Sequence, residues 1–205
     1  MRTRKEAKRE PGVAFRGRPG DTDWVADAIR YYRAAGFFPV HESDAAAEAY
    51  VREALRSEYG RTEELSGTED PEATLLGLDP DRVWAEDLEQ DVMKGNGMYE
   101  AIVRKFAAIS CGLLDVDAIA EVWETEDGPV HVRAVVNGEK RTFDARGMGD
   151  WYDFDAVLAA FDSWIAGTGH RYRSAVAPGQ DGIAIVLTDA EAARLSADRS
   201  WDFFE

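Results

Sequence analysis

Acidic side chains are concentrated in one stretch of the chain, where their type and spacing could bind a basic partner or a metal ion. Residues 61–92 carry eleven acidic and two basic side chains, a net charge of −9. From Asp81 the spacing of Trp84, Leu88 and Val92 predicts a helix, the third of the chain. On such a helix, acids three or four residues apart share a face. These acids are the candidate partner-binding face: Glu86, Asp87, Glu89 and Asp91.

A metal site is the less favoured use of these carboxylates. Helices that bind metal ions through carboxylates normally add a histidine at Glu-x-x-His spacing, and the chain has no such motif. Its histidines, His41, His131 and His170, lie far apart and none has ligand spacing. We therefore predict no metal and no cofactor. A plain solvated surface is the alternative to partner binding for the four acids.

No recognisable catalytic motif is present. The chain lacks a Gly-x-Ser-x-Gly elbow, a His-Glu-x-x-His helix, a paired Cys-x-x-Cys and a kinase signature. The glycines of Gly167-Thr168-Gly169 end a predicted helix and enter a strand, whereas a phosphate loop runs in the reverse order. We therefore predict no catalytic residue and no nucleotide site.

One histidine has a predictable neighbour. Asn137-Gly138 is the strongest hairpin signal in the chain, because both central positions of a type I′ turn need a positive φ. The register that this turn sets places His131 opposite Asp144, which predicts a cross-strand pair. An enzyme with an unfamiliar carboxylate and histidine site remains the alternative function if several such groups meet in one cleft. Its candidate residues are Glu86, Glu89, Asp91, His131 and Asp144.

The overall charge bears on the choice of partner. The chain has 205 residues and a formal net charge of −16. Such a surface repels nucleic acid and anionic lipid and attracts basic proteins, although solubility alone would also explain it. Residues 1–20 form a basic arm of net charge +5, so the remainder carries −21. We expect this arm to be a solvated tail or to lie on the acidic body.

The apolar pattern predicts an α+β fold. Four helices are expected before residue 114: from Asp23 to Gly36, from Ser43 to about Glu58, from Asp81, and from Met98 to Leu113. The second half reads βββαββα, a mostly antiparallel sheet of about five strands with a helix packed on it. Its expected strands are 119–125, 130–136, 139–144, 170–177 and 182–187, with helices at 152–166 and after Thr188, where Glu191 completes a capping box.

This pattern also predicts the domain organisation and the core. We expect one compact domain over 21–205, helical over 21–114 and sheet over 115–205, with Ile183–Leu187 as a central strand. The expected core residues are Trp84, Leu88, Ile102, Phe106, Val132, Phe154, Leu158, Phe161, Ile185 and Leu187.

Three further observations concern location and surface. No apolar run reaches the 18 or so residues that span a bilayer, and the charged first residues do not resemble a signal peptide. A cytoplasmic location is therefore expected, with Cys111 as a buried thiol.

Trp201 and Phe203 near the end of the chain either dock on the body or present an exposed apolar surface to a partner. They are therefore also candidate partner-binding residues.

Part of the chain resembles an uncharacterised family of bacterial proteins. The resemblance rests on the segment from Asp87 to Tyr99, on Ile109-Ser110-x-Gly112, on Glu121-x-Trp123, on Asp150-Trp151 and on Gln180. It covers roughly residues 80–205 and implies no activity. In size and composition the chain is also similar to the immunity proteins that neutralise bacterial toxins. We therefore expect a non-enzymatic, acidic binding protein, possible partners being basic proteins such as a toxin.

Overall fold

The computed structural model describes residues 24–59, 71–175 and 180–204, and its architecture is α+β, as the sequence predicts. The basic arm of residues 1–20 lies outside these ranges. The helices are α1 (Trp24–Ala34), α2 (Asp44–Tyr59), α3 (Pro71–Leu76), α4 (Met98–Ala108), α5 (Phe154–Trp164) and α6 (Asp189–Arg199). The strands are β1 (Val83–Asp87), β2 (Val116–Trp123), β3 (Val130–Val136), β4 (Glu139–Ala145), β5 (His170–Ala175), β6 (Asp181–Thr188) and β7 (Phe203–Phe204).

The strands form two antiparallel sheets instead of the single sheet that we expected. One has the order β1-β6-β5-β7 and the other the order β2-β3-β4. The predicted βββαββα order is confirmed from β2 to α6. The strands before α5 and those after it belong to different sheets: β2, β3 and β4 form the three-stranded sheet, whereas β5 and β6 belong to the four-stranded one. Strands β1 and β7, which the sequence did not indicate, complete the four-stranded sheet.

The predicted third helix is wrong, because residues 83–87 form strand β1. Val83 and Trp84 are adjacent, yet both are only 3% exposed. Neighbouring side chains of a strand point to opposite faces, so both can be buried only when each face of the sheet is covered. A spacing of four, as between Trp84 and Leu88, fits the period of a helix and also twice the period of a strand. The apolar spacing therefore could not distinguish the two, and the helix predicted from it is wrong.

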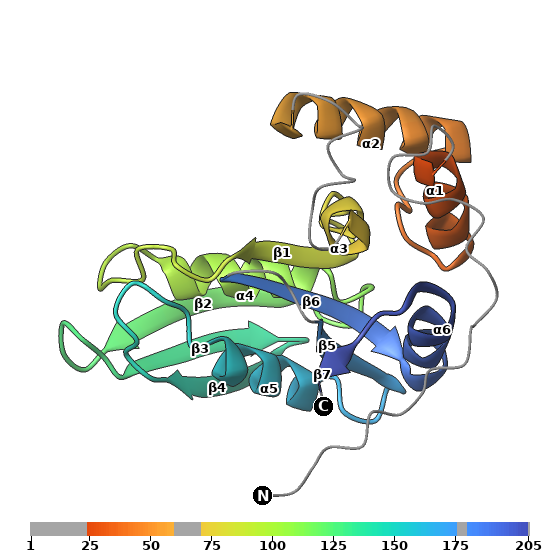
Figure 1. Cartoon of the computed structure of the whole chain (residues 1–205). Coiled ribbons are helices and arrows are strands. Elements are labelled where there is room, and N and C mark those ends of the chain that lie inside the picture. Colours follow the sequence, from red (N-terminus) through yellow and green to blue (C-terminus); the bar gives the residue numbers. More distant parts are fainter. Residues whose placement is uncertain (1–23, 60–70, 176–179, 205) are drawn as a thin grey trace, which may run out of the picture.

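The four-stranded sheet separates two hydrophobic cores. From β6, Ile183, Ile185 and Leu187 join the core formed with α1, α2, α3 and α6. Ala184 and Val186 face the core that α4 and α5 share with the three-stranded sheet. The prediction that Ile183–Leu187 is a central strand buried on both faces is therefore confirmed. Figure 1 shows α1, α2 and α3 gathered beyond β1, with β2, β3 and β4 on the other side of the molecule.

Seven of the ten predicted core residues are buried. They are Trp84, Ile102, Phe106, Val132, Phe161, Ile185 and Leu187. The other three, Leu88, Phe154 and Leu158, are partly buried and pack against the second core. The prediction of a buried Cys111 is wrong, since this residue is exposed in the turn that follows α4, with a positive φ of 58°.

The local signals of the second half are confirmed. Asn137 and Gly138 turn the β3–β4 hairpin with φ values of 51° and 81°. The Asn137 side chain also binds the chain that enters β2, accepting from the Asp115 amide at 2.8 Å and donating to the Leu113 carbonyl at 3.0 Å. At α6, Thr188 and Glu191 form the predicted capping box.

Candidate functional site: a pocket between three loops

The predicted acidic face does not exist as one surface. Glu86 and Asp87 are neighbours in β1, so their side chains leave opposite faces of the strand. Glu86 forms an ion pair with Lys105 of α4. Glu89 and Asp91 lie beyond the end of β1, in the segment that leads to α4. The four acids are therefore distributed over a strand and a loop and do not pair on a helix.

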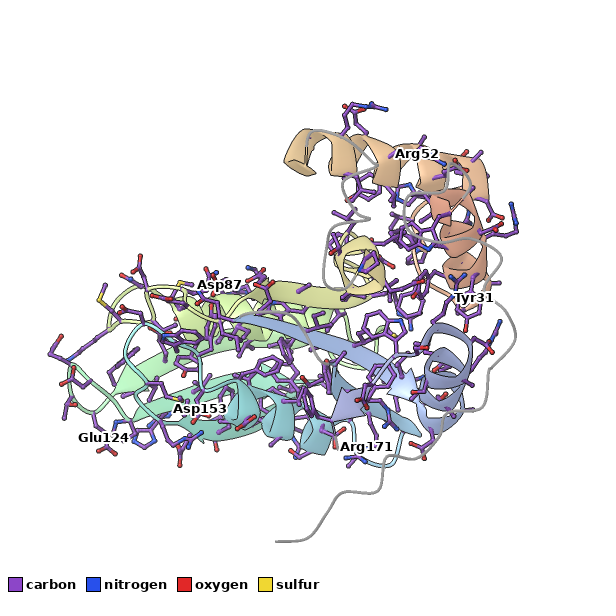
Figure 2. The ribbon with its side chains drawn as sticks, viewed as in Figure 1. Tyr31, Arg52, Asp87, Glu124, Asp153 and Arg171 are labelled. Atoms are coloured by element: carbon purple, nitrogen blue, oxygen red, sulfur yellow. The ribbon has the colours of Figure 1, made fainter. Side chains whose placement is uncertain are left out.

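Asp87 and Glu89 are nevertheless brought together by Gln180. The Gln180 amide nitrogen donates to both carboxylate oxygens of Asp87, at 2.9 and 2.8 Å, and to Oε2 of Glu89 at 3.1 Å. The backbone amide of Glu89 donates to Asp87 at 2.8 Å. One side-chain amide thus holds two carboxylates beside the entrance of the β1–α4 loop, where Figure 2 shows Asp87.

The β1–α4 loop, residues 88–97, is bound to the segment before α5. The amides of Gln90 and Tyr152 donate to the carbonyls of Asp150 and Leu88, at 2.8 and 3.1 Å. Within the loop, the Asn96 side chain donates to the Asp91 carbonyl at 2.9 Å. The loop is therefore held by backbone hydrogen bonds at its start and by its own asparagine near its end.

A pocket of about 330 Å³ lies where this loop meets two others. The second is the β2–β3 turn, residues 124–129, and the third is the β4–α5 loop, residues 146–153. Trp123, the last residue of β2, contributes a partly buried indole to the wall. Two exposed methionines, Met93 and Met148, lie on the first and third loops.

The second and third loops meet through their backbones, which requires glycine. A Cβ atom on Gly147 would lie 1.5 Å from the carbonyl oxygen of Asp127, so any side chain at this position would force the two loops apart. A Cβ atom on Gly128 would lie 2.8 Å from the Gly147 backbone. Two glycines within residues 147–149 indicate that the backbone here can approach another segment closely, but the sequence does not show which segment that is.

The pocket is acidic, with three carboxylates against one ammonium, a net charge of −2. Lys94 of the first loop spans to Glu126 of the second at 3.1 Å. Within the described part of the chain, the carboxylates of Asp127 and Asp150 have no hydrogen-bond or ion-pair partner. Two carboxylates without a described partner therefore line the same pocket as the Trp123 indole.

Glu121 fixes the inner side of this region. It accepts from the Tyr99 amide at 3.0 Å and from the Trp123 indole nitrogen at 3.1 Å. Gly97, the N-cap of α4, has no side chain for this purpose, so a glutamate on β2 caps the helix instead. Burial raises the pKa of Tyr99 to about 12, so its hydroxyl stays protonated and accepts from the Asp153 amide at 3.1 Å.

Asp153 anchors the third loop to α5. Its buried carboxylate accepts from the backbone amide of Arg146 at 2.9 Å, from the Arg146 guanidinium at 2.8 Å twice, and from the Ala156 amide at 3.4 Å. The hydrogen bonds from the Arg146 guanidinium hold the pKa of Asp153 below its ordinary value. The loop is therefore tied to the first turn of α5 by a carboxylate that stays ionised.

The two aromatic candidates near the end of the chain lie elsewhere. Trp201 is only 7% exposed, belongs to the first core, and donates from its indole nitrogen to the Tyr32 hydroxyl at 2.9 Å. Phe203 is partly buried and stacks on Trp201 at 5.8 Å. Of the two alternatives that the sequence leaves open, docking on the body is the one found for both rings. Phe204 is the exposed aromatic residue here.

The enzyme candidates do not converge. The predicted pair of His131 and Asp144 is confirmed, with 2.7 Å between Nδ1 and Oδ1, and it lies on the three-stranded sheet. Glu86 pairs with Lys105 and Glu89 accepts from Gln180, and no contact described in the structure joins either acid to the His131–Asp144 pair. Among the residues that the structure describes, no group of three or more His, Cys, Asp or Glu side chains is arranged to hold a metal ion.

Compared with protein-family models, curated proteins and solved structures, the chain matches none. In the ranges 24–59, 71–175 and 180–204, no helix has the length and apolar character needed to cross a membrane.

Proposed function

We propose that this chain is a non-enzymatic binding protein of the cytoplasm that receives a basic protein partner at the pocket between the three loops. An immunity protein or another inhibitor of a toxin is the kind of protein that this description fits. The partner would insert a lysine or arginine side chain between Asp127, Asp150 and the indole of Trp123.

The observation that carries the proposal is the pair of unpartnered carboxylates in the pocket. A cationic side chain entering there would gain two charge-assisted contacts, and Trp123, which lines the same pocket, is the type of aromatic residue to which ammonium and guanidinium groups bind. Lys94 already places one ammonium group against Glu126 from within the chain, so the walls accept such a group. The volume of about 330 Å³ suits one long side chain.

The surroundings of the pocket support the same partner chemistry. Asp87, Glu89 and Asp91 lie at and beyond the end of β1, on the way into the first loop, and add negative charge beside it. The exposed Met93 and Met148 provide flexible apolar contacts around the charged centre. Glu86 is already paired with Lys105, and Trp201 and Phe203 pack on the body, so these three do not belong to the proposed surface.

The net charge of −16 adds long-range attraction for a basic partner. Carboxylates that imitate phosphate would suit a toxin that acts on nucleic acid. Such attraction increases the rate of association at low salt and weakens as ionic strength rises.

The test uses a fluorescent hexa-arginine peptide as the probe and the double variant Asp127→Asn, Asp150→Asn. We expect affinity to fall about fivefold, since two exposed charge pairs together contribute about 1 kcal/mol. The salt dependence should become shallower as well. Affinity is measured by fluorescence anisotropy at low and high salt.

The matched control is the double variant Glu42→Gln, Asp202→Asn. Both residues are exposed, and no described contact involves their side chains. The control removes the same charge away from the pocket and should cost much less affinity. Equal losses in the two variants would contradict the proposed site and leave only the attraction of the net charge.

A further inference from the structure

His131 has a carboxylate on each of its ring nitrogens. Its Nδ1 lies 2.7 Å from Oδ1 of Asp144, and its Nε2 lies 2.7 Å from Oε1 of Glu124. The imidazole therefore bridges β4 to the residue that directly follows β2. A neutral imidazole has only one N–H, so it can donate to one of these carboxylates and must turn a lone pair to the other. Both contacts are hydrogen bonds only when the ring is protonated.

Among the described residues, no cation adjacent in register competes for these carboxylates. In the sheet, His131 lies between Val122 of β2 and Asp144 of β4. The same face of β3 carries Arg133 two residues further, and its register neighbours are Ala120 and Thr142. Hydrogen bonds from the ring to the carboxylates of Asp144 and Glu124 hold the pKa of His131 above its ordinary value.

Glu124 begins the turn that carries two of the pocket carboxylates. Its amide donates to the Pro129 carbonyl at 3.0 Å, which closes the turn around Glu126 and Asp127. The Thr125 hydroxyl donates to the Gly128 carbonyl at 2.6 Å. Figure 2 shows Glu124 at the end of the molecule farthest from α1 and α2. The His131 contact therefore fixes the turn from the side of the three-stranded sheet.

We propose that His131 is a proton-dependent latch that holds the β2–β3 turn in place, and so regulates binding of a cationic side chain at the pocket between the three loops. Below the folded-state pKa of His131 the ring donates to both carboxylates and the turn is held. As pH rises through that pKa, one contact is lost. Glu124 is the partner released, because it lies beyond the end of β2 whereas Asp144 lies inside β4. The binding consequence rests on the proposed function.

The latch and simple charge repulsion predict opposite effects of His131→Gln on the affinity for a cationic probe. A protonated His131 places a positive charge near an acidic pocket, so charge alone would make removal of the histidine favourable for a cationic probe. If the latch dominates, removal is unfavourable. His131→Gln removes the charge and the second donor at every pH. His41→Gln is the control, because it also removes a histidine. The His41 ring contacts the Tyr50 ring and not a carboxylate.

Binding of the hexa-arginine peptide is measured at about pH 6 and about pH 9, where arginine stays charged. We expect the wild type and His41→Gln to bind about threefold more tightly at the lower pH. His131→Gln should bind at both values as weakly as the wild type does at the higher one. Tighter binding by His131→Gln at the lower pH, or no difference from the wild type, would overturn the latch.

A second measurement does not depend on binding. Hydrogen exchange of the Glu124 amide, corrected for its intrinsic pH dependence, should lose protection in the wild type as the His131 ring titrates in NMR spectra. In His131→Gln its protection should be low and constant. Protection that is unchanged by the titration refutes the latch. If the wild type binds the peptide at neither pH, the proposed function fails, while this exchange experiment still decides the latch.

Discussion

Replacement of Asp153 by asparagine tests whether one buried carboxylate joins the third loop to α5. The side chain of Asp153 is 3% exposed. Asparagine keeps the oxygen that accepts from the Ala156 amide but replaces Oδ2 with an NH₂ group. That group would face the Arg146 backbone amide, which now donates to Oδ2 at 2.9 Å. The Arg146 amide would thus lose its acceptor and meet a second donor beside the buried Asp153 side chain.

The magnitude follows from this backbone contact. A hydrogen bond to a charged acceptor contributes about 1.5–3 kcal/mol. The Arg146 side chain is 69% exposed, so we assign its ion pair no part of the total. We expect Asp153→Asn to lower the free energy of unfolding by about 2–3 kcal/mol. For a chain of this size, the melting temperature should fall by roughly 4–12 °C.

Urea unfolding followed by tryptophan fluorescence measures the change. The control is Asp155→Asn, which removes the same charge from the first turn of α5 but changes an exposed side chain. It should lower stability by about 0.5 kcal/mol or less. A loss in Asp153→Asn no larger than in this control would refute the assigned contact.

The pH dependence supplies an independent check. Because the folded-state pKa of Asp153 is lowered, its stabilisation is fully present above the pKa of the unfolded chain and disappears as pH falls through the folded value. The difference in stability between the wild type and Asp153→Asn should therefore be constant near neutrality and shrink under acid conditions. A difference that grows as the pH falls would contradict the assigned direction.

Two further predictions concern the core and the pocket wall. Phe161 is fully buried among Phe106, Trp164 and Tyr172, so Phe161→Ala should lower the free energy of unfolding by about 3–5 kcal/mol in urea unfolding, and wild-type stability would contradict the position of α5. Gly147→Ala places a methyl group against the Asp127 carbonyl and should displace the pocket wall, so hexa-arginine binding should weaken while circular dichroism still shows a folded chain. Unchanged affinity would show that this wall does not matter for binding.

Features fixed by short-range geometry could be predicted from sequence. The Asn137-Gly138 turn needs two positive φ angles, and once it is placed, the register of β3 and β4 follows and brings His131 opposite Asp144. The capping box of α6 depends on Thr188 and Glu191 alone.

The identity of β1 depended on distant residues. The segment around Trp84 has apolar spacing compatible with a helix, and only its pairing with β6 makes it a strand. β6 needs hydrogen-bond partners on both edges, and β1 and β5 supply them. The sequence does not show which segment will fill the second edge, so its apolar spacing alone predicts a helix face for Glu86 and Glu89 that does not exist.

The sequence by itself determined the α+β class, the β3–β4 hairpin, the buried central strand and the acidity of the chain, because each follows from neighbouring residues or from composition. Only the tertiary structure decided that there are two sheets and that three loops meet at one pocket. Asp127 and Asp150 come from different loops, and the backbone contact at Gly147 brings those loops together. Such a contact between segments distant along the chain leaves no periodic pattern in the sequence, because it depends on how the two sheets pack around α4 and α5.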